Sequence, residues 1–445
     1  MSDSGAAHAH ARIQSRVNRR TFLRSSAIVA AASRVPPLFA QRAETPLPPS
    51  IAALTSMRDQ AKPITNDERR ARIEKARRIM SAEKIGALVL TGGASLAYFT
   101  NIRWFGGERL FACVIPSKGE PFFVCPAFEE ERAMEQIARG PFGGGRADVR
   151  TWQEDESPYA LVARGLADRK LSTAAIGIEE TAKFVWTEGI ARAARQAHVV
   201  LGTPVTAGCR MIKDAHELEL MQLANTATWT VYRAVYQALQ PGMTQRQVSE
   251  LIEQAYHRVG FPGEASVQTG AYTALPHGSM EPQVIAEGTI IMVDDGCTVE
   301  GYQSDITRTF VLGKASETMK RVFDIVRRAQ SAALAAAKSG AALESIDAAA
   351  RKVITDAGYG PGFKFFTHRL GHGIGMEGHE WPYLVKNNMF GWARSLRAQP
   401  GMTFSDEPGI YIRGEFGVRL EDDMVITTEG GKLFTPQSES LERPF

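Results

Sequence analysis

The sequence is poor in cysteine. It has only 4 cysteines in 445 residues: Cys113, Cys125, Cys209 and Cys297. Their spacing contains no CxxC pair, and four are too few to staple a chain of this length, so zinc fingers and disulfide scaffolds are excluded. We expect buried free thiols, while a bridge between Cys113 and Cys125 on neighbouring strands stays open.

Long apolar runs and a large net charge are also missing. No stretch approaches the roughly 18 to 20 apolar residues that a membrane span needs. The composition, 44% hydrophobic and 23% charged, is that of a globular protein. The first forty residues have a net charge of +5 and the whole chain has one of +3, so the remaining residues have a net charge of −2. This balance gives no support for a nucleic-acid partner or a polybasic membrane surface.

Residues 1–40 have the features of an export signal. The stretch "NRRTFLR" (residues 18–24) is followed by the mildly apolar "SSAIVAAAS" and Arg34, which resembles a twin-arginine signal peptide. The alternative is a disordered basic tail. We expect recognition by the twin-arginine export machinery, cleavage near Ala40, and a periplasmic or extracellular protein.

Two domains are expected after a linker. Residues 41–65 are rich in proline, which predicts an extended linker. Residues 66–205 begin with an amphipathic helix and continue with short apolar strands alternating with helices, which predicts an α/β domain. Residues 206–445 open with one long helix over residues 209–240, followed by a region of strands, tight turns and Ala-rich helices.

One apolar stretch of the second domain carries two carboxylates. "IMVDDGCTVEGYQSDITRTFVLG" (residues 291–313) reads as two strands joined by a turn. Asp294 and Asp305 are equidistant from the boundary between Val299 and Glu300, so a turn there would place them directly opposite each other. Two like charges in an apolar ladder are unfavourable unless one is protonated or a cation lies between them.

A second pair of carboxylates has the same arrangement. Glu407 and Glu421 are centred on Gly414, between apolar runs, and His372 lies between the two hairpins in the glycine-rich "HRLGHGIG". Four carboxylates and one imidazole are too many ligands for one ion and suit two divalent ions with shared carboxylates. Bound cations would therefore make both hairpins stable.

The order of these motifs is that of a known family. "VDDG…SDITRT", "HRLGHGIG…GHEWP", "EPGIY" and "VRLED" resemble the prolidase, aminopeptidase P and creatinase group of pita-bread metallopeptidases, over residues 66–445. The resemblance implies an α/β (α+β) protein. It would have a creatinase-like α/β N-terminal domain and a catalytic domain with a curved, mainly antiparallel sheet covered by helices.

The resemblance also implies roles for the metal ligands. Asp294 would be the terminal ligand of one ion, and Asp305 and Glu421 would bridge the two ions. His372 and Glu407 would complete the second ion. Manganese is the first expectation for both, with cobalt, iron and zinc left open by this ligand mix.

Further site residues are implied in the same way. His277 and His379 match the family's substrate-contacting and proton-handling histidines, His368 matches one near the scissile carbonyl, and Arg419 matches an arginine that orders the carboxylates or meets the substrate. Glu407 would also act as a proton shuttle. Plain structural roles remain the alternative for His277, His368 and Arg419.

Four neighbouring positions carry expectations of their own. Asp295 and Asp422 flank predicted ligands, but strand alternation would turn them to the opposite face. Asp406 and Gly378 depart from the residue types usual in the family, and either could reshape the substrate pocket.

The resulting expectation is a dinuclear-metal hydrolase. It would cleave the peptide bond before proline, as an Xaa-Pro aminopeptidase or Xaa-Pro dipeptidase, with a metal-bridging hydroxide as nucleophile. The substrate would be a peptide with proline at its second position, and the resemblance implies a homodimer or higher oligomer. The alternatives are a hydrolase or lyase acting on a small non-peptide substrate, and a non-catalytic metal- or ligand-binding relative.

Overall fold

The structure is a computed structural model that describes residues 46–104, 107–145, 147–388 and 393–445. The chain divides into Met1–Leu47 and Pro48–Phe445, and the second unit holds all the elements of the fold. The expected export signal lies outside the described residues. Among the described residues, no helix combines the length and apolar character that crossing a membrane requires.

The N-terminal part is an α/β layer built on a six-stranded sheet in the order β4-β3-β2-β1-β5-β6. β1 runs parallel to β5 and antiparallel to β2. The strands are β1 (Ile85–Leu90), β2 (Ala112–Pro116), β3 (Phe122–Pro126), β4 (Asp148–Trp152), β5 (Ala175–Ile178) and β6 (His198–Leu201). The helices are α3 (Asn66–Ala82), α4 (Gly93–Thr100), η2 (Ala127–Glu129), α5 (Glu130–Arg139), α6 (Pro158–Asp168) and α7 (Phe184–Ala193).

The possible cysteine bridge does not form. Cys113 on β2 pairs with Phe123 rather than with Cys125, and Cys125 on β3 pairs with Thr151 on the other side. All four cysteines are buried free thiols, as the scarcity of cysteine predicts.

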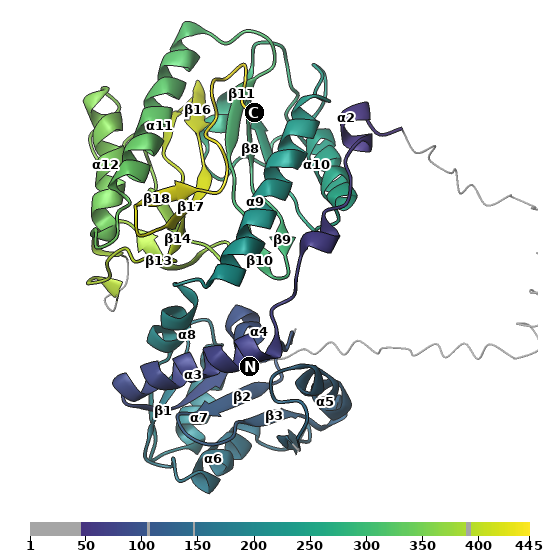
Figure 1. Ribbon diagram of the computed structural model, residues 1–445, viewed down its shortest axis with the longest axis vertical. Coiled ribbons are helices and arrows are strands. Elements are labelled where there is room, and N and C mark those ends of the chain that lie inside the picture. Colours follow the sequence, from purple (N-terminus) through teal and green to yellow (C-terminus); the bar gives the residue numbers. More distant parts are fainter. Residues whose placement is uncertain (1–45, 105–106, 146, 389–392) are drawn as a thin grey trace, which may run out of the picture. The chain divides into compact units, whose positions relative to one another are not determined.

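The segment expected to be an extended linker contains helical turns. α2 (Pro49–Ala52) and η1 (Arg58–Gln60) form here, because a proline at the first helical position has the required φ and lacks no needed N–H. Arg258 donates hydrogen bonds to the carbonyls of Ala52 and Leu54. Residues 48–60, which we call the strap, therefore lie against the second part of the chain, where Figure 1 shows α2 beside α10.

The long helix predicted over residues 209–240 is wrong at its start. α8 (Thr203–Arg210) ends before a short non-helical stretch, and α9 (Ala215–Tyr236) begins anew. Asp214 caps α9, since its side chain accepts from the backbone N–H of Glu217 while the Glu217 side chain accepts from that of Asp214. This capping box interrupts an apolar periodicity that otherwise continues.

The second part holds a curved, wholly antiparallel set of strands, in agreement with the expected pita-bread architecture. A three-stranded sheet has the order β11-β8-β7 and a five-stranded sheet the order β13-β12-β14-β17-β18, with β9-β10 and β15-β16 as two-stranded ribbons. Figure 1 shows α9 and α10 on one side of these strands and α11 and α12 on the other.

The second part of the chain contributes twelve strands and five further helices among the described residues. The strands are β7 (Ser266–Thr269), β8 (Ile290–Asp294), β9 (Thr298–Val299), β10 (Tyr302–Gln303), β11 (Arg308–Val311), β12 (Gly371–Gly373), β13 (Glu380–Leu384), β14 (Thr403–Asp406), β15 (Gly409–Ile412), β16 (Phe416–Arg419), β17 (Asp422–Ile426) and β18 (Gly431–Leu433). The further helices are α10 (Gln245–Val259), η3 (Gly270–Ala274), α11 (Glu317–Ala336), α12 (Leu343–Asp356) and η4 (Lys386–Asn388).

Apolar packing holds the strands in place. Val326 on α11, Ile346 on α12 and Phe404 on β14 are fully buried in one hydrophobic cluster. Burial on this scale contributes about 1.5–3 kcal/mol for each large side chain. The face of the sheet away from this cluster is therefore free to carry polar groups.

Candidate metal centre

The first carboxylate hairpin differs from its predicted register. Its tight turn is formed by Glu300 and Gly301, whose φ values are +50° and +95°, and β8 pairs with β11 so that Val293 faces Arg308. The same register continues to place Asp294 opposite Thr307 instead of Asp305. The turn lies one position later than predicted, because a glutamate in a left-handed conformation gives no clear signal in sequence.

The second carboxylate hairpin has the predicted register. β15 and β16 pair Gly409 with Arg419, and Gly414 at the turn has φ +81°. The strands before and after them keep this register, since Asp406 of β14 faces Asp422 of β17. Glu407 and Glu421 therefore face each other where the ribbon leaves the larger sheet.

All five predicted ligands converge. Three overlapping groups have ligand atoms that lie within 4.8 Å of one another. Asp305 and Glu421, the expected bridging residues, each belong to two of them. The groups are Asp294, Asp305 and Glu421; His372, Glu407 and Glu421; and Asp305, His372 and His379.

His372 is buried between the two hairpins, on a backbone where two glycines allow close approach. A Cβ at Gly371 would lie 2.0 Å from the carbonyl oxygen of Ser405. His372 Nδ1 lies 3.2 Å from the carbonyl oxygen of Gly373, which can only accept, so the proton is on Nδ1. Its Nε2 faces Glu407 Oε1 at 3.3 Å and Asp305 Oδ2 at 3.8 Å.

This geometry fits a cation. Burial lowers the pKa of His372 well below its ordinary value, so a lone pair on Nε2 points at two carboxylates. Burial raises the pKa of Glu407 to about 7, and burial together with neighbouring carboxylates raises the pKa values of Asp305 and Glu421 well above the ordinary range. Divalent ions would offset the repulsion among these groups.

Arg419 and Thr307 hold the first hairpin's carboxylate. The Arg419 guanidinium forms an ion pair with Asp294 and donates from Nε to Thr307 Oγ1 at 2.9 Å. The Thr307 hydroxyl contacts both Asp294 and Glu421. Arg419 thus orders the carboxylates, whereas Thr307 was missed because its importance follows only from the corrected register.

His379 and His277 both face the cavity. The His379 ring stacks on that of His372 with ring centroids 3.7 Å apart. Arg369 donates to His379 Nδ1 at 3.1 Å, so the proton of a neutral His379 is on Nε2. His277 is exposed at the rim.

His368 also lines the cavity, but both of its ring nitrogens have protein partners. Nδ1 donates to the carbonyl of Arg369 at 2.7 Å, and Nε2 accepts from the Tyr411 hydroxyl at 2.8 Å. The Tyr411 hydroxyl in turn accepts from Arg419. These contacts give His368 a structural role, next to the substrate contact expected from the resemblance.

The ligands open onto a cavity of about 500 Å³. Sequence reasoning missed two of its charged residues, Arg369 and Asp295. Arg369 is half-buried and stacks over the Tyr383 ring, 4.1 Å from its centroid. The lining residues are Pro276, His277, Asp294, Asp295, Asp305, His368, Arg369, His372, His379, Val385, Glu407, Arg419 and Glu421.

The strand-alternation argument holds for one flanking acid and is wrong for the other. Asp422 is fully buried on the far side, where it pairs with Arg308 at 2.6 Å. Asp295 follows the last residue of β8 and has φ +125°, so alternation does not apply to it. Its side chain lines the cavity.

The two departures from the family pattern lie outside the cavity lining. Asp406 is fully buried opposite Asp422, and burial raises its pKa well above the ordinary range. A Cβ at Gly378 would lie 3.1 Å from Gln303 Oε1. Neither Asp406 nor Gly378 lines the cavity, so the structure gives no support for the expected effect on pocket shape.

Comparisons with known proteins agree with this geometry. Residues 72–212 match the creatinase/prolidase N-terminal domain and residues 219–428 match metallopeptidase family M24. The chain is 35% identical over 349 residues to a probable dipeptidase PepE of Mycobacterium tuberculosis, covering 78% of this chain and 88% of that protein. It is 32% identical over 356 residues to an Xaa-Pro dipeptidase of Lactobacillus helveticus, covering 78% and 92%.

A solved structure extends the match to three dimensions. The crystal structure of dipeptidase PepE from Mycobacterium ulcerans superposes with a TM-score of 0.78 at 33% identity, covering 86% of this chain and 99% of that one. With its converging carboxylates and histidines and its two matched domains, the protein belongs to metallopeptidase family M24.

Proposed function

We propose that this protein is a dinuclear-metal Xaa-Pro dipeptidase, which hydrolyses the bond before the proline of a dipeptide. The observation that carries the proposal is the convergence of four carboxylates and His372 in overlapping groups, with the unprotonated Nε2 of His372 facing two of the carboxylates. The name of the Lactobacillus helveticus relative supports this substrate class.

Two divalent ions would be held by the five converging residues, with manganese as the first choice. When bound, such ions lower the pKa of water to give a nucleophile near neutral pH and polarise the scissile carbonyl. The five residues are Asp294, Asp305, His372, Glu407 and Glu421.

The protein's own groups would orient the substrate and handle protons. Glu407, whose carboxylate lies among the converging ligands, can accept a proton from water and pass it on. His379 carries its proton on Nε2 and is exposed to the cavity, so it can donate to the carbonyl oxygen or to the leaving nitrogen. His277 at the rim is placed to contact the same substrate atoms.

Arg369 favours a dipeptide over a longer peptide. Its guanidinium forms one wall of the cavity, beside His379. A guanidinium binds a carboxylate strongly, and in a dipeptide the proline carboxylate is free. In a longer peptide that carboxyl group is part of the next peptide bond and carries no charge for Arg369 to bind. An Xaa-Pro aminopeptidase, which acts on longer peptides, is therefore the second candidate.

The test measures free proline released from Gly-Pro and the N-terminal residue released from Arg-Pro-Pro, with manganese or with EDTA. We expect metal-dependent cleavage of Gly-Pro that exceeds cleavage of Arg-Pro-Pro. His372→Ala should abolish it, while His198→Ala, a change on the exposed edge strand β6, should not. Metal binding without turnover of either peptide would contradict the proposal, and preferential cleavage of Arg-Pro-Pro would favour an aminopeptidase.

We propose further that residues 1–40 direct export by the twin-arginine route and that the protein forms a homodimer or higher oligomer. Export is tested by the fraction of full-length chain outside the cytoplasm, compared with a variant carrying Arg19→Lys and Arg20→Lys. Light scattering on the purified protein gives the mass of the assembly.

A further inference from the structure

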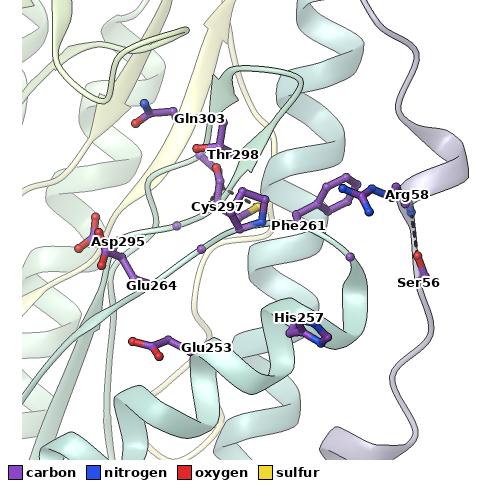
Figure 2. Close-up of a pocket in the computed structure, with 15 residues that line it drawn as sticks. Ser56, Arg58, Glu253, His257, Phe261, Glu264, Asp295, Cys297, Thr298 and Gln303 are labelled. Carbon is purple, nitrogen blue, oxygen red and sulfur yellow. Dashed lines mark hydrogen bonds between the residues drawn. The ribbon is translucent and has the colours of Figure 1, made fainter. Parts of the chain in front are cut away.

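A second, larger cavity shares the lining residue Asp295 with the metal cavity. Its volume is about 1010 Å³, and Figure 2 shows the residues around it. The strap, α10, the loop 260–264 and the loop after β8 contribute to its walls. Asp295 lines both cavities, so this residue lies at the boundary between them.

Asp295 is held in an unusual backbone conformation. Its φ of +125° is rare for a residue with a side chain. Two hydrogen bonds fix its carbonyl oxygen, from the Tyr232 hydroxyl at 2.9 Å and from the backbone N–H of Ile306 at 3.1 Å. Backbone strain of this kind is concentrated at functional sites. Here it exposes a carboxylate one residue after a metal ligand.

The carboxylate of Asp295 has no hydrogen bond or ion pair with the residues that the structure describes. Figure 2 shows Glu264 beside it, with Glu253 of α10 on the same side, whereas Arg58 of the strap lies at the opposite end. The end of the second cavity at Asp295 is therefore acidic. Such an end attracts a cation and repels an anion.

The metal cavity has charges of opposite sign on two walls. Arg369 comes from the segment before β12, and Asp295 comes from the loop after β8. If the carboxylate of a dipeptide binds Arg369, its N-terminal residue can lie at Asp295, because both residues line the same cavity. The side chain of that residue can then enter the second cavity.

We propose that the second cavity binds the side chain of the substrate's N-terminal residue and that Asp295 selects a basic one, arginine or lysine. This inference rests on the proposed dipeptidase function and names its substrate class. Glu264 adds negative charge at the same end, so it strengthens the selection without being its main determinant.

The experiment compares Arg-Pro with citrulline-Pro, which have nearly the same shape and differ by one charge. The measured quantity is the ratio of their kcat/KM values, in which any general effect on the metal centre cancels. We expect the wild type to prefer Arg-Pro by about tenfold, the size expected of one partly desolvated ion pair. Asp295→Asn should bring the ratio close to 1, and asparagine tolerates positive φ better than most residues.

Three further measurements sharpen the result. Glu264→Gln should lower the ratio less than Asp295→Asn does. Glu429→Gln, an exposed acid in the turn between β17 and β18, should leave the ratio unchanged. The wild-type ratio should also fall as salt is raised, because the attraction is electrostatic.

The outcomes separate this inference from the function on which it rests. If the metal-loaded wild type cleaves neither of these dipeptides nor Gly-Pro, the proposed function fails; if it cleaves Gly-Pro alone, only the inference is overturned. If it cleaves both with a ratio near 1, or if Asp295→Asn leaves a high ratio in place, the inference is overturned and the function stands. Loss of bound metal in Asp295→Asn with an unchanged ratio would assign Asp295 to the metal centre and also overturn it.

Discussion

The two hairpins that supply the carboxylates are built differently. The second keeps one register from β14 and β17 through β15 and β16, around a glycine at the turn. The first also keeps one register, but longer loops, residues 295–297 and 304–307, separate its ribbon β9-β10 from β8 and β11, whereas two residues on each side separate β15-β16 from β14 and β17. Glu407 and Glu421 lie between the ladders of the second hairpin, whereas in the first hairpin Asp294 ends β8 and Asp305 lies in the loop before β11.

The ligands of the two hairpins are held by different contacts. The second hairpin supplies Glu407 and Glu421 from the two-residue breaks between its ladders, where the Ser405 hydroxyl contacts Glu407 and the Thr307 hydroxyl contacts Glu421. In the first hairpin Asp294 is held by Arg419 and Thr307, and the backbone N–H of Asp305 is held by the buried carboxylate of Asp423 at 3.0 Å. The loop after β8 also exposes Asp295.

The largest expected effect comes from the second hairpin. Glu421→Gln removes a ligand shared by two of the three ligand groups, whereas Asp294 belongs to one. We expect Glu421→Gln to lower activity on Gly-Pro by well over ~100-fold, beyond the 10–100-fold typical of losing an outer-shell partner, with loss of bound metal. Asp294→Asn should retain more metal by elemental analysis. Equal metal loss in both variants would contradict the comparison.

Thr307 gives the next largest effect. Thr307→Val keeps the shape of the side chain and removes the hydroxyl that touches carboxylates of both hairpins. We expect about a 10–100-fold loss of metal affinity, measured by competition with a chelator.

Thr226→Val on the exposed face of α9 is the matched control and should change nothing. An unchanged affinity in Thr307→Val would show that the first hairpin needs no such support.

The sequence also predicts the two hairpins to different extents. A glycine centred between two glutamates predicts register reliably, because glycine adopts positive φ at little cost. Glu300 at the other turn and Asp295 after β8 also adopt positive φ, but their residue types do not predict this conformation. Their conformations follow from tertiary contacts, such as the Tyr232 hydroxyl on the Asp295 carbonyl.

Helix boundaries show the same limit. Apolar periodicity predicts a helix through residues 211–214, but the capping box of Asp214 and Glu217 favours a new start. Proline content predicts extended chain, although Pro49 begins α2. The ligand identities were predictable because their chemistry is local, whereas Thr307 and Arg369 become visible only when segments distant in sequence meet.

The stability of the metal-free protein should depend on pH in the direction opposite to that of most proteins. Burial raises the pKa of Glu407 from 4.5 to about 7, so the folded state binds more protons than the unfolded state between these values. Stability therefore falls as pH rises through this window. With EDTA, we expect Tm to decrease by several degrees between about pH 5 and 8.

Added manganese tests the cause of that decrease. A cation replaces the bound protons, so the fall should shrink or reverse when metal is present. Glu407→Gln should weaken the fall in EDTA, because glutamine does not titrate. If the Tm of the metal-free protein rises steadily with pH, the pKa of Glu407 is not raised by its buried position among the other carboxylates.

The smallest effect concerns the two turns themselves. Gly414→Ala places a side chain at φ +81° and should destabilise the second hairpin by about 1 kcal/mol, while Glu300→Gly relieves φ +50° and should be neutral or slightly stabilising. Urea denaturation of the metal-free protein measures both. Because only two residues separate the ribbon β15-β16 from β14 and β17, Gly414→Ala should also weaken metal binding through Glu407 and Glu421, whereas Glu300→Gly should not, since longer loops join the ribbon β9-β10 to β8 and β11. Equal effects of the two changes on metal affinity would mean that turn geometry matters alike in both hairpins.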